Sequence, residues 1–189
     1  MAVVVASLVL LAVVSGFNLL LTFGLVRRLK AHTTLLSLLV DTDKLLPVGG
    51  SIPEFSATTP DGAPFDRDRL DGPAALAFLS VDCPHCRTSL PEFVAYVQGG
   101  NYPPEKVLAV VCADDDAASL GAADMVAALA PVANLVREPL AGGPVSQAFG
   151  VQVFPTFYLT GPGGVLAAGA HAVRNLPGAR PHSTTQRRA

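Results

Sequence analysis

The chain has 189 residues, of which 15% are charged and 50% are hydrophobic, and its formal net charge is −2. The length allows one domain with accessory segments, and a net charge near zero gives no reason to expect a nucleic acid as a partner. Three cysteines are too few for a disulfide-rich scaffold.

The N-terminal segment is an uncharged apolar run. Residues 3–26 contain no charged side chain, and a helix of this length spans roughly 36 Å, enough to cross a hydrocarbon core of about 30 Å. A cleaved signal peptide is the alternative, but it has a shorter apolar region, a basic region before it and a small-residue cleavage site after it. We therefore predict a transmembrane anchor over residues 1–26, which contacts the lipid bilayer through residues 3–26.

A predicted juxtamembrane stalk over residues 27–46 follows the anchor, because its leucines recur at near-helical intervals among polar residues. Arg27, Arg28 and Lys30 come directly after the apolar run. Positive residues favour the cytoplasmic side of a membrane, so this charge bias predicts a cytoplasmic C-terminal domain.

Strands and helices alternate in the globular domain, which we expect over residues 47–170. A hairpin is predicted over 52–65, and continuous apolar runs at 74–81 and 107–113 are typical of strands buried on both faces. We expect helices over 87–98, 114–130 and 145–149, a short strand over 134–136, and a terminal hairpin over 155–170. This alternation predicts an α/β layer.

The most informative motif is Cys83-Pro84-His85-Cys86, which follows a buried run and opens a predicted helix. In dithiol chemistry one sulfur attacks as a thiolate and the second resolves the mixed disulfide. The unpaired N–H groups and the dipole of a helix start stabilise a Cys83 thiolate. His85 adds a ring that carries a positive charge when protonated, and Pro84 removes no donor that the first turn needs. We predict Cys83 and Cys86 as catalytic residues, supported by Pro84 and His85.

Other candidate residues have structural interpretations. Cys112 lies in an apolar run and is predicted to be a small core residue. His32, His171 and His182 lie in flanking segments, where we expect solvated side chains. Residues 171–189 lack an apolar period and are predicted to form a flexible tail.

Pro155 opens a β-rich run. A proline has no N–H to donate to a central ladder, so we expect it at the first strand position or in an unusual bond geometry.

The order of these features resembles the thioredoxin superfamily. A strand leads to a C-x-x-C motif at a helix start, a crossover follows, and Phe154-Pro155-Thr156 precedes a terminal hairpin. With its apolar N-terminus and the 53–62 hairpin, the chain is most similar to the membrane-tethered TlpA/ResA group, including MauD-type proteins of methylamine utilisation. The resemblance covers about residues 47–170. It implies a thioredoxin-like fold, in which a central mixed sheet is flanked by helices, with an N-terminal hairpin extension and a single transmembrane helix.

The resemblance also implies a function. Pro155 would be a cis-proline packed against the dithiol, and the backbone of Phe154 would bind a substrate strand. The protein would be a membrane-tethered thiol–disulfide oxidoreductase that exchanges disulfides with protein partners, is recycled by a redox partner and needs no cofactor or metal. Its domain would be extracytoplasmic, against the charge bias at Arg27. The Pro-His dipeptide, also found in DsbA, predicts a couple more oxidising than thioredoxin.

The chain departs from the thioredoxin pattern at two places, and two alternative functions remain. Ala77 occupies the position of the buried acidic residue of thioredoxins, and little sequence after Ala170 is able to build their closing helix.

A peroxiredoxin-like peroxidase would use Cys83 alone, but its P-x-x-x-T-x-x-C pattern is met only in part, by Ser80. A module that binds Cu(I) would use the two sulfurs and His85.

Overall fold

The computed structural model describes residues 1, 4–7, 9–11, 13–16, 45–100, 102–113 and 120–179. The chain divides into two compact units, Met1–Asp43 and Lys44–Ala189. In the first unit, residues 4–7, 9–11 and 13–16 are helical and exposed. None of the helices in these described ranges combines the length and the apolar character needed to cross a membrane. Residues 17–44, which hold the rest of the predicted anchor and most of the predicted stalk, lie outside the described residues.

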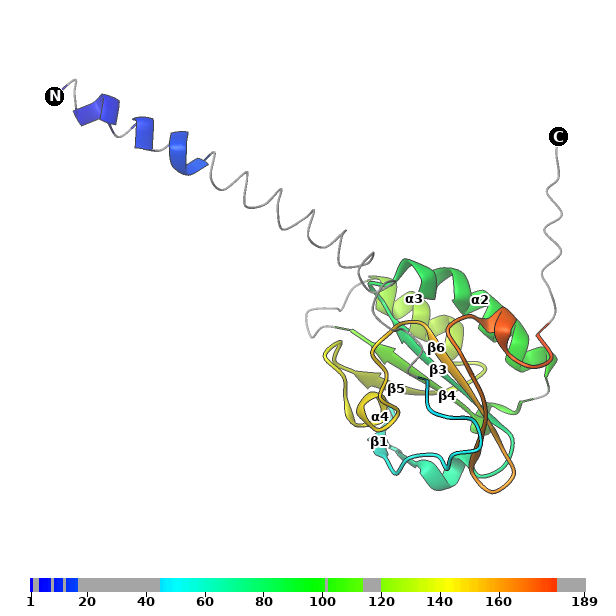
Figure 1. The fold of residues 1–189 in the computed structure, drawn as a ribbon. Coiled ribbons are helices and arrows are strands. Elements are labelled where there is room, and N and C mark those ends of the chain that lie inside the picture. Colours follow the sequence, from blue (N-terminus) through cyan, green and yellow to red (C-terminus); the bar gives the residue numbers. More distant parts are fainter. Residues whose placement is uncertain are drawn as a thin grey trace, which may run out of the picture. The chain divides into compact units, whose positions relative to one another are not determined.

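A five-stranded mixed sheet forms the centre of the second unit, with the strand order β5-β4-β3-β6-β7 (Figure 1). The strands are β3 (Ala74–Ser80), β4 (Val107–Cys112), β5 (Asn134–Glu138), β6 (Thr156–Gly161) and β7 (Val165–Ala170). β3, β4 and β5 are parallel, whereas β6 runs antiparallel to both β3 and β7. The predicted mixed sheet is therefore confirmed.

Helices and a hairpin cover the two faces of this sheet (Figure 1). One face carries α2 (Pro84–Gly99) and α3 (Leu120–Leu129), and the other carries α4 (Pro144–Ala148) and the hairpin of β1 (Ser56–Thr58) and β2 (Pro64–Asp66). Every residue of β3 is buried because its alternate side chains enter two separate cores. The continuous apolar run of the sequence follows from this two-sided cover.

Short 3₁₀ turns complete the unit, at η1 (Arg67–Leu70), η2 (Pro104–Lys106) and η3 (Val173–Asn175). The predicted hairpin, strands and helices are present with small shifts of their bounds. The acidic start of the second predicted helix, residues 114–119, lies outside the described residues.

The structure corrects the predicted start of the tail. Residues 171–179 include the η3 turn, and Val173 within it and Leu176 directly after it are only 4% and 3% exposed. The Tyr96 hydroxyl of α2 donates a hydrogen bond to the Pro177 carbonyl oxygen at 2.7 Å. Two apolar residues three apart are enough to pack here, but they are too few to produce a recognisable sequence period. Residues 180–189 of the predicted tail lie outside the described residues.

Candidate active site

The Cys83-Pro84-His85-Cys86 motif forms the start of α2, as the sequence predicts. Cys83 is the N-cap residue, and its sulfur accepts a hydrogen bond from the Cys86 backbone N–H at 3.3 Å. Pro84 takes the first helical position, where its fixed φ suits the helix and its missing N–H leaves no partner unsatisfied. This local geometry places one sulfur over the N-terminus of a sixteen-residue helix.

The surroundings of Cys83 favour its thiolate. The Cys86 thiol beside it, the backbone N–H groups of Cys86 and His85, and the positive charge of the His85 ring outweigh the opposing effect of burial. Together they lower the pKa of Cys83 to about 6, from an ordinary value of 9.0. Cys83 is partly exposed, and both Pro84 and His85 are exposed. The Cys83 sulfur is therefore ionised at neutral pH and accessible from solvent.

The second cysteine has the opposite character. Cys86 is 0% exposed, and its sulfur accepts a hydrogen bond from the Ser80 backbone N–H at 3.4 Å. The hydrogen bond to Cys83, followed by burial, raises the pKa of Cys86 far above its ordinary range. Cys86 thus remains a protonated thiol while Cys83 ionises, which suits a resolving residue.

The loop before β6 packs against the dithiol. Phe78 of β3 pairs with Thr156 of β6, so the chain entering β6 lies beside the chain that leaves β3 toward Cys83. The Phe154–Pro155 peptide bond is cis, as the family resemblance implies. The Cys83 thiol donates a hydrogen bond to the Phe154 carbonyl oxygen at 3.3 Å. Pro155 is buried and Phe154 is partly exposed, so the loop forms one wall of the site.

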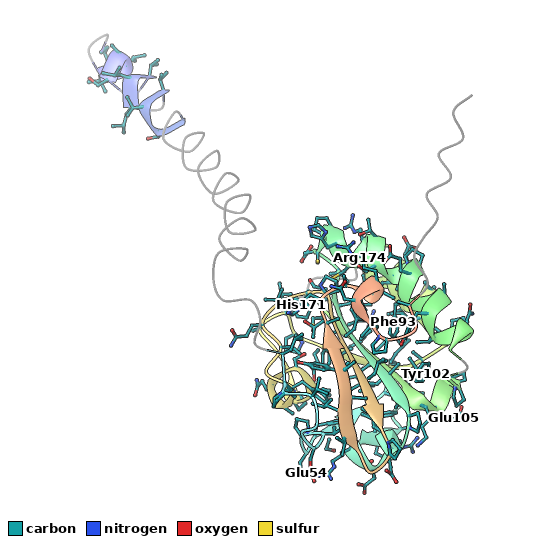
Figure 2. All side chains as sticks on the ribbon, turned by 45° about the vertical axis from the view of Figure 1, so that its right-hand side comes forward. Glu54, Phe93, Tyr102, Glu105, His171 and Arg174 are labelled. Carbon is teal, nitrogen blue, oxygen red and sulfur yellow. The ribbon has the colours of Figure 1, made fainter. Side chains whose placement is uncertain are left out.

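His171 also reaches this loop, which corrects the prediction of a solvated side chain. The residue follows β7 directly, and the pairing of Phe157 with Ala170 places it across from Thr156. Its Nδ1 lies 3.0 Å from the Thr156 hydroxyl and 3.3 Å from the Pro155 carbonyl oxygen. Figure 2 shows His171 at the end of the unit opposite Glu54. Sequence spacing does not reveal this contact, since only the register of β6 and β7 creates it.

The remaining sequence candidates lie apart from the dithiol chemistry. Cys112 is buried on the other face of the sheet, where its sulfur lies 3.6 Å from the Ser146 hydroxyl and burial raises its pKa to about 11. Ala77, at the position of the acidic residue of thioredoxins, is fully buried. The Ser80 hydroxyl accepts a hydrogen bond from the Asp82 backbone N–H at 3.3 Å, within the turn that leads from β3 to α2. Within the described part of the chain, no three His, Cys, Asp or Glu residues are grouped so that they could hold a metal ion.

Comparison with known proteins identifies the fold. No protein-family model matches the chain, and no curated protein matches its sequence. Among solved structures, the thioredoxin domain of a thiol-disulfide oxidoreductase from Bacteroides vulgatus is similar with a TM-score of 0.51 and 16% identity, over 66% of this chain and 88% of that one. A thio-disulfide isomerase from Thermus thermophilus has a TM-score of 0.53 and 18% identity, over 67% of this chain and 87% of that one.

A thiol-disulfide oxidoreductase from Bacteroides fragilis is similar to the same degree, with a TM-score of 0.50 and 17% identity over 64% of this chain and 89% of that one. At these identities the likeness concerns the fold. Three features of this chain agree with that likeness: the sheet order, the C-x-x-C motif at a helix start and the cis-proline loop. The chain therefore has a thioredoxin-like α/β fold.

Proposed function

We propose that this protein is a thiol–disulfide oxidoreductase that exchanges disulfides with other proteins through Cys83 and Cys86. One observation carries the proposal: a partly exposed Cys83, with a pKa lowered to about 6, caps a helix directly in front of a protonated, buried Cys86. This is the asymmetry that dithiol exchange needs, since one sulfur must meet the partner and the other must wait behind it.

The chemistry proceeds as two exchanges. A partner thiolate attacks Cys83 of the Cys83–Cys86 disulfide, and Cys86 leaves and takes up a proton because its thiol form is favoured. A second partner thiolate then attacks the partner's own sulfur in the mixed disulfide. Cys83 leaves as a thiolate, the partner gains a disulfide, and the protein is left reduced. A low pKa makes Cys83 a good leaving group, so oxidation of the partner is the favoured direction.

Trapping the mixed disulfide tests the activity. A Cys86→Ser variant lacks the resolving thiol. Its Cys83 thiolate should attack a disulfide of an oxidised test protein, release one sulfur of that disulfide as a thiolate, and remain bound to the other in a covalent complex. The Cys83→Ser variant is the matched control and should form no complex. Cys112→Ser should behave like the unmodified protein, because Cys112 is buried on the other face of the sheet. Equal trapping by the Cys83→Ser and Cys86→Ser variants would refute the proposal.

We further propose that the couple is more oxidising than that of thioredoxin. The groups that stabilise the Cys83 thiolate stabilise the reduced form, and this makes the disulfide the stronger oxidant. Equilibration with glutathione would give the reduction potential. A value at or below about −270 mV, that of thioredoxin, contradicts this part of the proposal.

The membrane tether and the TlpA/ResA-like, MauD-type specialisation belong to the proposal as well. The uncharged run of residues 3–26 supports a single-pass anchor. We place the domain on the extracytoplasmic side, where it would meet exported partner proteins and a recycling partner. Labelling of Cys83 in intact cells by a membrane-impermeant thiol reagent would support this placement. Labelling only after lysis would favour the cytoplasmic side, in agreement with the charges of Arg27, Arg28 and Lys30.

A further inference from the structure

A chain of hydrogen bonds closes the cis-proline loop. The Thr156 hydroxyl donates to the Val153 carbonyl oxygen at 2.7 Å, which ties the end of the loop to its beginning. His171 Nδ1 then contacts the Thr156 hydroxyl and the Pro155 carbonyl oxygen. On the other side, the Phe154 carbonyl oxygen faces the Cys83 sulfur. The loop is thus held from β7 on one side and meets the nucleophile on the other.

The direction of these bonds follows from what each atom is able to donate. A hydroxyl has one hydrogen, and Thr156 uses it for Val153, so the hydroxyl accepts from His171. The Pro155 carbonyl oxygen only accepts. His171 Nδ1 therefore carries a hydrogen and donates to both partners. Thr156 is 2% exposed, so loss of this donor would leave a buried hydroxyl with one partner fewer.

We propose that His171 is a positioning residue of the dithiol site, which holds the Phe154–Pro155 loop in register with Cys83 for exchange with a protein partner. The inference rests on the proposed exchange activity. The contacts of its Nδ1 with Thr156 and Pro155 connect the side chain to the loop that faces Cys83. Its role is to place the backbone of the loop, against which a partner chain would lie beside the reacting sulfur.

The loop also influences Cys83 directly. A carbonyl oxygen that accepts the Cys83 S–H bond stabilises the thiol and opposes the thiolate. Release of the loop would therefore lower the pKa of Cys83 further. A His171 that acted as a nearby positive charge would have the opposite effect, since its removal would raise that pKa. The sign of the change separates positioning from direct electrostatics.

The experiment compares His171→Ala with His171→Asn in the full chain. Asparagine keeps an N–H donor near the place of Nδ1, whereas alanine has none. The readouts are the rate of exchange with a protein disulfide, the rate with a small aromatic disulfide that does not need the loop, and the titration of Cys83. Arg174→Ala, an exposed change on the same segment (Figure 2), serves as the control.

We expect His171→Ala to slow exchange with the protein disulfide by about tenfold, as displacement of a positioning group does, and to change exchange with the small disulfide by less than about twofold. His171→Asn should restore the protein exchange, and Arg174→Ala should leave it unchanged. Cys83 of the alanine variant should titrate at a lower pH. Unchanged protein exchange in His171→Ala, or a raised Cys83 pKa, overturns the inference.

A second variant covers the case in which His171→Ala does not fold. Thr156→Val keeps the shape of the side chain but removes the hydroxyl that links His171 to Val153, and it should slow protein exchange in the same way. If the unmodified protein exchanges with neither disulfide, the proposed function fails, while the Cys83 titration of the variants still decides the positioning role of His171.

Discussion

At the scale of single residues, two cysteines three positions apart have opposite ionisation behaviour. Cys83 lies partly exposed at the N-terminus of α2, and Cys86 lies one turn further in and is fully buried. Their mutual hydrogen bond is the largest influence on both pKa values, lowering that of Cys83 and raising that of Cys86. In the proposed exchange, the order in which the two sulfurs react would follow from their positions along one helix turn.

Alkylation of the reduced protein should show the low pKa of Cys83. Iodoacetamide reacts with the thiolate, so the modification rate at Cys83 should rise with pH and reach half its maximum near pH 6. Peptide mass spectrometry would assign the modified residue. Cys86→Ala should move the midpoint to higher pH, because it removes the largest of the lowering influences. A midpoint near the ordinary value of 9.0 in the unmodified protein would contradict the prediction.

Replacement of His85 should have a smaller effect in the same direction. The backbone N–H of residue 85 remains in His85→Ala, but the charge of the ring is lost, so the pKa of Cys83 should rise modestly. The reduction potential should fall with it, since the reduced form loses part of its stabilisation. Both quantities come from a thiolate titration and a glutathione equilibration. A raised potential would show that the ring does not stabilise the thiolate.

At the scale of elements, a buried carboxylate connects β5 to α4. Glu138 at the end of β5 is 5% exposed, and its oxygens accept hydrogen bonds from the backbone N–H groups of Gly143, Val145 and Ser146 at 3.3, 2.6 and 3.0 Å. Four N–H groups at the start of any helix lack partners inside it. Glu138 therefore supplies the cap that the sequence around Gly143 does not contain.

Removal of this carboxylate should destabilise the domain. Glu138→Ala leaves buried donors without an acceptor, which costs about 3 kcal/mol of unfolding free energy. Urea denaturation would measure the loss. Glu138→Gln, which keeps one acceptor oxygen, should lose less, and Glu105→Ala at an exposed position should change stability by less than about 0.5 kcal/mol. Equal stability of the Glu138→Ala and Glu105→Ala variants would show that the contacts contribute nothing.

At the scale of the whole molecule, the redox state and the stability of the fold are linked. The hydrogen bonds and charge that stabilise the Cys83 thiolate act only in the folded, reduced protein. Folding therefore favours reduction of the Cys83–Cys86 disulfide more than it would favour reduction of a disulfide between two cysteines with ordinary pKa values. If the couple is as oxidising as proposed above, folding should stabilise the reduced form more than the oxidised form.

The reduced protein should melt at a higher temperature than the oxidised protein at pH 7. The folded pKa of Cys83, about 6, lies below its ordinary value of 9.0, which is that of the unfolded chain. This stabilisation is fully present above the unfolded pKa and is lost as the pH falls through the folded pKa. The difference in melting temperature should thus be smaller at pH 5 than at pH 8. Calorimetry of both forms at the two pH values would check it, and a higher-melting oxidised form at pH 8 would contradict it.

Local sequence patterns determined much of this protein. The apolar run of β3 is buried because both faces of the strand are covered, and the Cys83 motif opens a helix because Pro84 suits a first helical turn. The alternation of strands and helices predicted the α/β layer, and Pro155, expected at the first strand position or in an unusual bond geometry, has a cis peptide bond and directly precedes β6. Each of these features depends on neighbours within a few residues, or on a periodicity that the chain displays along its length.

Only the tertiary structure decided which distant groups meet. Cys83 and Phe154 are 71 residues apart in sequence and are joined by the pairing of β3 with β6. His171 reaches the cis-proline loop through the register of β7, although its own segment has no apolar period. Register depends on the packing of whole faces and on turn lengths, and a single side chain contributes little to either. For this reason the sequence predicted the Cys83 and Cys86 pair, whereas only the fold shows that the Phe154 carbonyl oxygen and His171 lie around it.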